Sequence, residues 1–140
     1  MIFTSNQPPL TNPMTQEPKK IQKLLQKLIN SESHPFPRKG QPIEAPTDHG
    51  VYIIYNAKDQ VAHVGRSVRG KNGLHQRLKN HLQGASSFAN KYLHGDGSKL
   101  RDGYKFKYLV IPDPRKRALV EALATGTLCP LHLGLGITNQ

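Results

Sequence analysis

Arg77 and His81 are two side chains whose types and spacing suit chemistry on a phosphate ester. They lie four residues apart in a segment whose leucine spacing predicts a helix over 74–83, so they project side by side along one edge of that helix. A guanidinium binds phosphate oxygens in bidentate fashion, and a neutral imidazole accepts a proton. A solvated helix edge has the same spacing, and that alternative stays open.

Glu121 is the acidic residue best placed to hold a metal ion. Hydrolysis of a phosphodiester needs a water nucleophile, a base and positive charge, and a Mg²⁺ held by one or two carboxylates supplies much of this. The acids after residue 60 are Asp96, Asp102, Asp113 and Glu121. Asp113 is explained as a helix cap, and Asp96 and Asp102 stand beside glycines. Glu121 alone lies within a predicted helix, where a solvated surface position is the alternative.

The charge balance points to a polyanionic partner. The chain of 140 residues has 20 Lys+Arg against 9 Asp+Glu, a formal net charge of +11. Residues 50–140 hold 14 of the basic and 5 of the acidic residues. Such a surface attracts nucleic acid, although a basic surface can also serve solubility alone. The run Arg115-Lys116-Arg117 opens the last predicted helix, where the helix dipole disfavours cations unless an anion is near.

The elements that must position these residues follow the order β-β-α-α-β-α. Strand character at 50–55 and 61–65 around a turn predicts a β-hairpin, and a Gly-rich basic loop at 66–73 leads to the helix over 74–83. The spacing then predicts a helix over 86–93, a strand over 104–111, and a helix that starts at Pro114 after the cap residue Asp113. This module covers residues 49–140.

The first 48 residues predict three segments of different character. Residues 1–17 are polar and predict a disordered arm, and the four prolines of residues 31–48 predict an extended linker. Between them, residues 18–30 predict an amphipathic helix with an apolar stripe opposite four lysines. Packing of the stripe on the main module is the simplest interpretation, and a homodimer contact or a DNA-clamping arm are the alternatives. A membrane-surface helix is disfavoured because aromatic anchors are lacking.

Cysteine usage and hydropathy predict a cytoplasmic protein. Cys129 is the single cysteine, so no internal disulfide can form. The start of the chain lacks the features of a signal peptide, and no apolar run approaches the ~20 residues needed to cross a bilayer.

Two short motifs resemble the pair that names the GIY-YIG nuclease family. They are Gly50-Val51-Tyr52 and, ten residues later, His63-Val64-Gly65. Arg77 and His81 match the family's Arg followed four residues later by Tyr or His, and Glu121 matches its glutamate on the last helix. The similarity covers about residues 49–134. It implies an α+β fold with a small three-stranded antiparallel sheet flanked by helices.

The resemblance also implies an activity, a cofactor and residue roles. The activity is divalent-metal-dependent endonuclease cleavage of nucleic acid, DNA before RNA, with Mg²⁺ or Mn²⁺ held by Glu121. Tyr52 would position or deprotonate the attacking water, with His81 accepting its proton. Arg77 and Arg66 would hold the scissile phosphate, and His63 would complete the water network.

Three departures from the family pattern accompany these expectations. His63 stands where the second motif has Tyr, and the loop before Arg77 is longer, with Arg69 and Lys71 forming an additional phosphate-binding segment. The Asn that follows a Pro near the end of most members is missing after Pro130, where His132 is a possible replacement.

Other functions remain open at this stage. The missing Asn favours a nucleic-acid-binding module without catalysis. A zinc or histidine-rich metal site is disfavoured, because the seven histidines and one cysteine do not have tetrahedral ligand spacing. A partner-binding protein acting through the helix at 18–30 is a further possibility.

Overall fold

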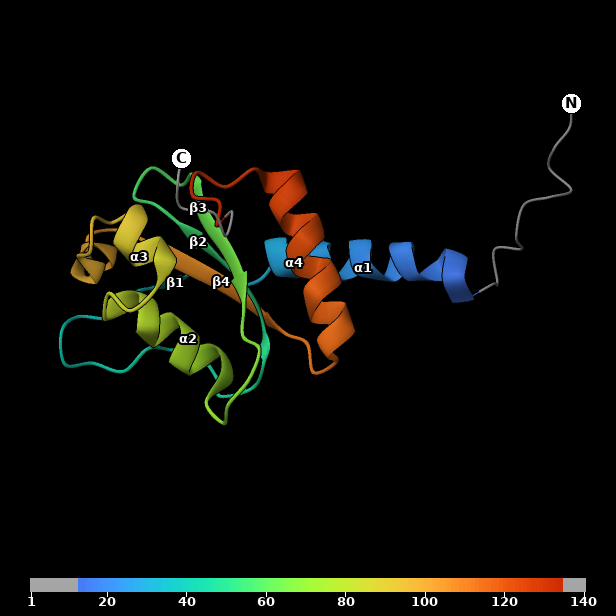
Figure 1. Ribbon diagram of the computed structural model, residues 1–140, viewed down its shortest axis with the longest axis horizontal. Helices are drawn as coiled ribbons and strands as arrows, with labels where there is room; N and C mark the ends of the chain where they lie inside the picture. The colour runs from blue at the N-terminus through green and yellow to red at the C-terminus, as the bar shows by residue number, and fades with distance from the viewer. Residues whose placement is uncertain (1–12, 135–140) are drawn as a thin grey trace, which may run out of the picture.

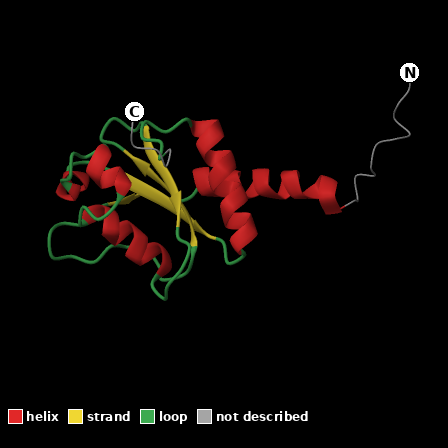
Figure 2. Cartoon of the chain, viewed as in Figure 1, coloured by secondary structure: helices red, strands yellow, loops and turns green. Residues whose placement is uncertain are grey.

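The computed structural model describes residues 13–134, and these form a four-stranded antiparallel sheet between two layers of helices (Figures 1 and 2). The predicted arm at residues 1–17 lies outside the described residues up to residue 12. Its last five residues are helical, because the helix predicted over 18–30 begins at Pro13. The elements are α1 (Pro13–Ile29), β1 (His34–Pro35), β2 (Gly50–Tyr55), β3 (Val61–Arg66), α2 (Gly73–Leu82), α3 (Ser87–Lys91), the 3₁₀ helix η2 (Gly97–Arg101), β4 (Lys105–Val110) and α4 (Pro114–Leu128). The predicted α+β class and the order of the main elements are confirmed.

Strand β2 is a central strand of the sheet and separates two cores. The strand order is β1-β4-β2-β3, with β2 antiparallel to both β3 and β4. Successive side chains of a strand point to opposite faces, so Tyr52 and Ile54 face one core while Val51 and Ile53 face the other. All four are fully buried. The motif tyrosine is therefore held rigidly at the middle of the sheet.

The two helical layers cover different faces of the sheet. Helices α2 and α3 lie on the Tyr52 face, where Leu74, Leu78 and Phe88 join the core. Helices α1 and α4 lie on the Val51 face and contact each other. The predicted leucine line of α2 is thus its buried side, and it fixes which side chains of that helix turn toward Tyr52.

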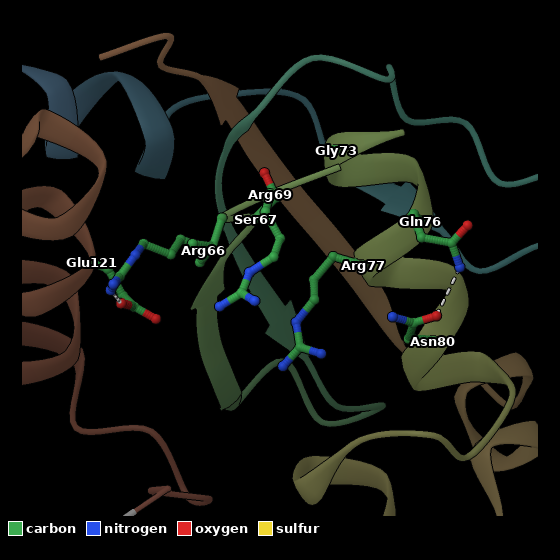
Figure 3. A pocket seen from close by; sticks show the side chains of 9 residues that line it. Arg66, Ser67, Arg69, Gly73, Gln76, Arg77, Asn80 and Glu121 are labelled. Atoms are coloured by element: carbon green, nitrogen blue, oxygen red, sulfur yellow. Dashed lines mark hydrogen bonds and ion pairs between the residues drawn. The ribbon is translucent and has the colours of Figure 1, made fainter. Parts of the chain in front are cut away.

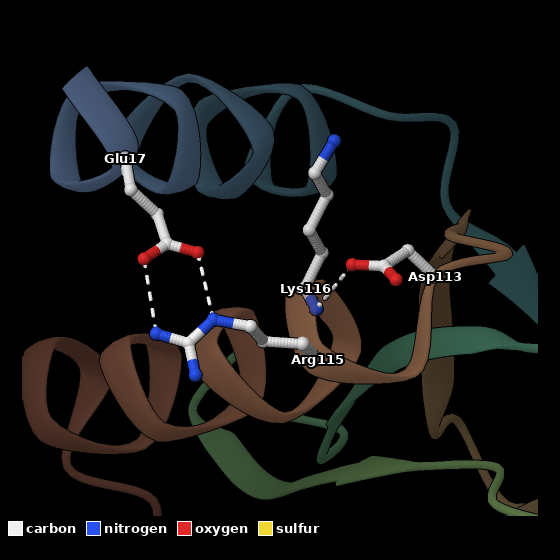
Figure 4. Close-up of polar contacts among 4 residues, drawn as sticks. All are labelled: Glu17, Asp113, Arg115 and Lys116. Carbon is white, nitrogen blue, oxygen red and sulfur yellow. Dashed lines mark hydrogen bonds and ion pairs between the residues drawn. The ribbon is translucent and has the colours of Figure 1, made fainter. Parts of the chain in front are cut away.

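Helix α1 packs on the module through its apolar stripe. Ile21, Leu25 and Leu28 are buried against α4 and the sheet. Glu17 of α1 accepts two hydrogen bonds from Arg115 of α4, at 2.9 and 3.0 Å (Figure 4). The stripe that was the first candidate for a homodimer contact is therefore occupied within the chain.

The sheet has four strands where three were predicted, because the predicted linker contributes a strand. β1 pairs with β4, with His34 opposite Phe106 and Pro35 opposite Lys105. A strand of two residues that includes a proline has no periodicity from which to predict it. Farther along the same segment, Phe36 and Ile43 are buried in the Tyr52-side core. The segment therefore packs along the sheet.

Helix α4 begins at the predicted cap. The Asp113 carboxylate accepts the Lys116 backbone N–H at 3.1 Å, and Pro114 occupies the first turn. The helix continues past Gly126 and ends at Leu128, because Cys129 takes the left-handed conformation with φ of 48°. Across residues 13–134, every helix is too short or too polar to span a bilayer.

Candidate active site

Tyr52 and His81 form a hydrogen-bonded pair in the core beneath the hairpin. Tyr52 Oη lies 2.6 Å from His81 Nε2, and both residues are fully buried. His81 follows Leu78 on α2, and the same leucine line that docks α2 on the sheet turns its imidazole toward Tyr52. The two rings meet edge to face at 5.5 Å. The two side chains are thus within hydrogen-bonding distance, and the role of His81 as acceptor of the Tyr52 proton stays a prediction.

Burial dominates the acid–base properties of this pair. It raises the pKa of Tyr52 well above its ordinary 10.0, while the nearby positive charge of Arg77 acts in the opposite direction. Burial also lowers the pKa of His81 well below 6.5, with smaller effects from His63 and Arg77. At neutral pH the phenol keeps its proton and the imidazole is neutral, so His81 is available as an acceptor.

The close approach of Gly65 leaves room for the phenol. A Cβ atom added at Gly65 would lie 2.4 Å from Tyr52 Oη and 2.6 Å from its Cζ. Gly65 is opposite Tyr52 in the β2–β3 register, so its missing side chain is the space that the hydroxyl occupies. The glycine of the second motif therefore has a steric role next to the first.

His63 extends the aromatic cluster around the pair. Its ring stacks on Phe88 at 4.7 Å and lies 5.1 Å from the His81 ring and 5.4 Å from that of His132. Both His63 ring nitrogens are buried and have no hydrogen-bond partner among the described residues. Burial, with smaller contributions from His132 and Arg77, lowers the pKa of His63 to about 3. The ring is therefore neutral at physiological pH.

An open cavity of about 470 Å³ lies beside this buried cluster. Three arginines line it: Arg66 from the end of β3, Arg69 from the following loop and Arg77 from α2 (Figure 3). Among the described residues, Glu121 of α4 is the single acid in its wall. Three guanidinium groups against one carboxylate in its wall make the cavity a strong attractor for a multiply charged anion such as phosphate.

Glu121 currently pairs with one of these arginines. Its Oε1 accepts a hydrogen bond from Arg66 Nη1, and the two side chains are 25% and 35% exposed. Within the described residues, no group of three His, Cys, Asp or Glu side chains could hold a metal by itself. A lone carboxylate on an anion-binding cavity fits Mg²⁺, which keeps several waters and binds through one or two carboxylates and substrate phosphates.

The loop that carries Arg69 is tied to the hairpin by His49. Its Nε2 lies 3.0 Å from the Gly70 carbonyl, which only accepts, so Nε2 donates and Nδ1 accepts from the Ser67 hydroxyl at 3.0 Å. Ser67 Oγ in turn accepts the Gly50 N–H at 3.0 Å. This network holds the loop that forms one side of the cavity against Gly50 of the first motif.

The structure separates the predicted site residues into groups. Arg66, Arg69, Arg77 and Glu121 share the cavity, whereas Tyr52, His63 and His81 form the buried cluster next to it. Arg77 influences the pKa values of all three buried residues, so it links the two groups. Lys71 is exposed on the loop and does not line the cavity.

The predicted basic run at the start of α4 is a different kind of feature. Arg117 is only 5% exposed and therefore cannot contact an external phosphate in this conformation. Arg115 is engaged with Glu17, which supplies the anion that the helix start was expected to need. Lys116 remains exposed. Arg115 thus links α4 to α1, and Arg117 lies on the buried side of α4. The run therefore offers little surface for binding nucleic acid.

Sequence reasoning missed several residues of the site. Gln76 and Asn80 line the cavity and share a hydrogen bond of 2.7 Å, and Ser67 lines it as well. The sequence could have indicated Gln76 and Asn80, because helical spacing places both beside Arg77 on one face of α2. Ser86, which lies 2.7 Å from His81 Nδ1, gave no such signal.

Comparison with known proteins gives a likeness among solved structures. No family model matches the sequence, and no curated protein matches it. Among solved structures, the chain is similar to the GIY-YIG N-terminal endonuclease domain of UvrC from Thermotoga maritima bound to its catalytic divalent cation, magnesium, with 19% identity over 81% of this chain and 94% of that one, and a TM-score of 0.46. A point mutant of that domain bound to its catalytic divalent cation gives the same identity and TM-score and is covered over 93%.

Proposed function

We propose that this chain is a divalent-metal-dependent endonuclease that hydrolyses phosphodiester bonds of nucleic acid, with DNA the first substrate to test. The observation that carries the proposal is the position of Arg77. It lines the cavity with two further arginines and Glu121, and its charge also acts on the buried Tyr52–His81 pair. Phosphate-binding groups and a proton-handling pair therefore meet at one side chain.

Each residue then has a distinct task. Arg66, Arg69 and Arg77 bind the oxygens of the scissile and neighbouring phosphates. Glu121 holds Mg²⁺ or Mn²⁺, which when bound supplies positive charge to the phosphate and lowers the pKa of bound water. Tyr52 Oη orients the attacking water and takes a proton from it, while its own proton passes to His81 Nε2 along the 2.6 Å hydrogen bond. His63, which packs against His81 and stacks on Phe88, keeps bulk water away from the Tyr52–His81 pair.

A nucleic-acid-binding module without catalysis is the second candidate. The ion pair between Arg66 and Glu121 supports it, because it occupies the carboxylate that a metal needs. Both candidates share phosphate binding and therefore a steep fall of affinity with salt.

Nicking of supercoiled plasmid in Mg²⁺ separates the two. Wild type is compared with Glu121→Gln, which keeps the size of the side chain and removes its charge, and with Glu32→Gln, the same change at an exposed residue remote from the cavity. The nuclease proposal expects metal-dependent nicking by wild type and Glu32→Gln, and none by Glu121→Gln. Binding without nicking by all three proteins would favour the second candidate.

A further inference from the structure

Ser86 closes a chain of buried hydrogen bonds that starts at Tyr52. Its Oγ lies 2.7 Å from His81 Nδ1 and accepts the Ala89 N–H at 3.0 Å. Ser86 is the N-cap of α3 and only 6% exposed. The imidazole is therefore held at both nitrogens, with a phenol on one side and a serine hydroxyl on the other.

A neutral imidazole has one N–H and one acceptor nitrogen, so two proton arrangements are possible. In the first, Tyr52 donates to Nε2 and Nδ1–H donates to Ser86 Oγ. In the second, Ser86 donates to Nδ1, and Nε2–H donates to Tyr52 Oη. The second arrangement leaves the buried phenol proton without an acceptor, because the neighbouring Arg77 can only donate and Nε2 is the one acceptor described at Tyr52 Oη. The first arrangement leaves only the Ser86 hydroxyl proton without a described acceptor. Ser86 is 6% exposed whereas Tyr52 is fully buried, so the first arrangement is favoured.

We propose that Ser86 is a positioning residue that sets the tautomer of His81. By accepting Nδ1–H, it keeps the Nε2 lone pair directed at Tyr52, where the phenol proton has to go. This inference rests on the proposed function for its catalytic consequence. The tautomer itself is a property of the resting protein and is measured without substrate.

Two variants separate the effect of the Ser86 hydroxyl on His81 from its effect as the N-cap of α3. Ser86→Thr keeps both. Ser86→Gly removes the hydroxyl and leaves a residue that is itself well tolerated as a helix N-cap. The ¹⁵N chemical shifts of the His81 ring in ¹⁵N-histidine-labelled protein report which nitrogen carries the proton, and thermal unfolding of each variant reports its fold.

The expected result is an Nδ1–H tautomer for His81 in wild type and Ser86→Thr, with Ser86→Gly populating Nε2–H. Cleavage by folded Ser86→Gly should fall by at least about tenfold, a part of the roughly 10²–10⁴ that general acid–base catalysis contributes. An Nε2–H tautomer in wild type, which needs no variant to be seen, would overturn the proposal. So would an unchanged tautomer in Ser86→Gly. Absence of nicking by wild type would count against the nuclease proposal and leave the tautomer result standing.

Discussion

The two regions of the candidate site differ in their access to water. On the Tyr52 side every polar atom of the pair is buried, and burial is the largest cause of the shifted pKa values. On the Arg66 side the guanidinium groups border an open cavity, and the Arg66–Glu121 pair is partly exposed. In the buried region each nitrogen of His81 has a single partner, whereas three arginines share the open region. Single changes should therefore have large effects on the first side and graded effects on the second.

Removing the phenol oxygen tests the buried side most severely. Tyr52→Phe leaves His81 Nε2 without its partner and removes the group that orients the water. Single-turnover cleavage should fall by roughly 10²–10⁴, the usual contribution of general acid–base catalysis. Nucleic-acid affinity should stay unchanged, because the arginines are intact. Tyr55→Phe, on the same strand but half-buried, is the matched control. Equal loss of binding and cleavage would contradict the division between the two regions.

The buried histidines should make the fold sensitive to mild acid. The pKa of His63 is about 3 and that of His81 is well below 6.5 in the folded chain. As pH falls below about 6.5, the unfolded chain binds protons that the folded chain does not, so the free energy of unfolding decreases. The slope approaches about 1.4 kcal/mol per pH unit for each histidine.

Urea unfolding between pH 7 and pH 5 measures this slope. His63→Phe preserves the stack on Phe88 and should reduce the slope, while His94→Asn replaces an exposed histidine as the control. A free energy of unfolding that stays constant between pH 7 and pH 5 would mean that His63 and His81 take up protons in the folded chain as they do in the unfolded chain.

Filling the space beside the Tyr52 phenol should have the next largest effect, a loss of stability. In Gly65→Ala the new methyl group would overlap Tyr52 Oη, and relief requires movement of a buried strand or ring. Overpacking of this kind costs about 1–3 kcal/mol. Gly126→Ala is the control, since a Cβ there meets nothing within 4 Å and alanine favours a helix. Gly65→Ala should lower the midpoint of unfolding and Gly126→Ala should raise it. Equal midpoints would contradict the close approach of Gly65 to Tyr52.

The same contrast explains which features could be predicted from sequence. The hairpin, the leucine face of α2 and the Asp113 cap depend on local periodicity and were predicted. The Tyr52–His81 pairing followed from a motif resemblance. Ser86 was missed because its contact with His81 depends on the tight turn at Gly84, which no periodic pattern specifies.

The inward turn of Arg117 and the packing of Phe36 were missed for a related reason. Arg117 lies on the buried face of α4 with Val120 and Ala124, and Phe36 packs on Phe106 of β4. Residue type alone predicted a surface cation in one case and a linker residue in the other.

On the open side, losing one arginine should weaken binding without abolishing it. Arg69→Gln removes one of three cavity cations. Affinity for a DNA duplex should fall about tenfold, and the slope of log affinity against log salt should decrease by about 1. Lys58→Gln, in the turn at the far end of the hairpin, removes the same charge and should leave both quantities nearly unchanged. Equal effects of the two variants would indicate that net charge, and not the cavity, determines binding.

The smallest expected effect concerns the ion pair itself. In Arg66→Gln the Glu121 carboxylate loses its partner and becomes available to a cation. A partly exposed pair contributes up to about 1 kcal/mol, so Mn²⁺ affinity without nucleic acid should rise by about fivefold, as measured by electron paramagnetic resonance titration. The double variant with Glu121→Gln should lose that gain. Because coupling between ligands is reciprocal, an anion that draws Arg66 away from Glu121 in wild type should strengthen Mn²⁺ binding as well. Weaker Mn²⁺ binding by Arg66→Gln would mean that the arginine orders the carboxylate for the metal instead of competing with it.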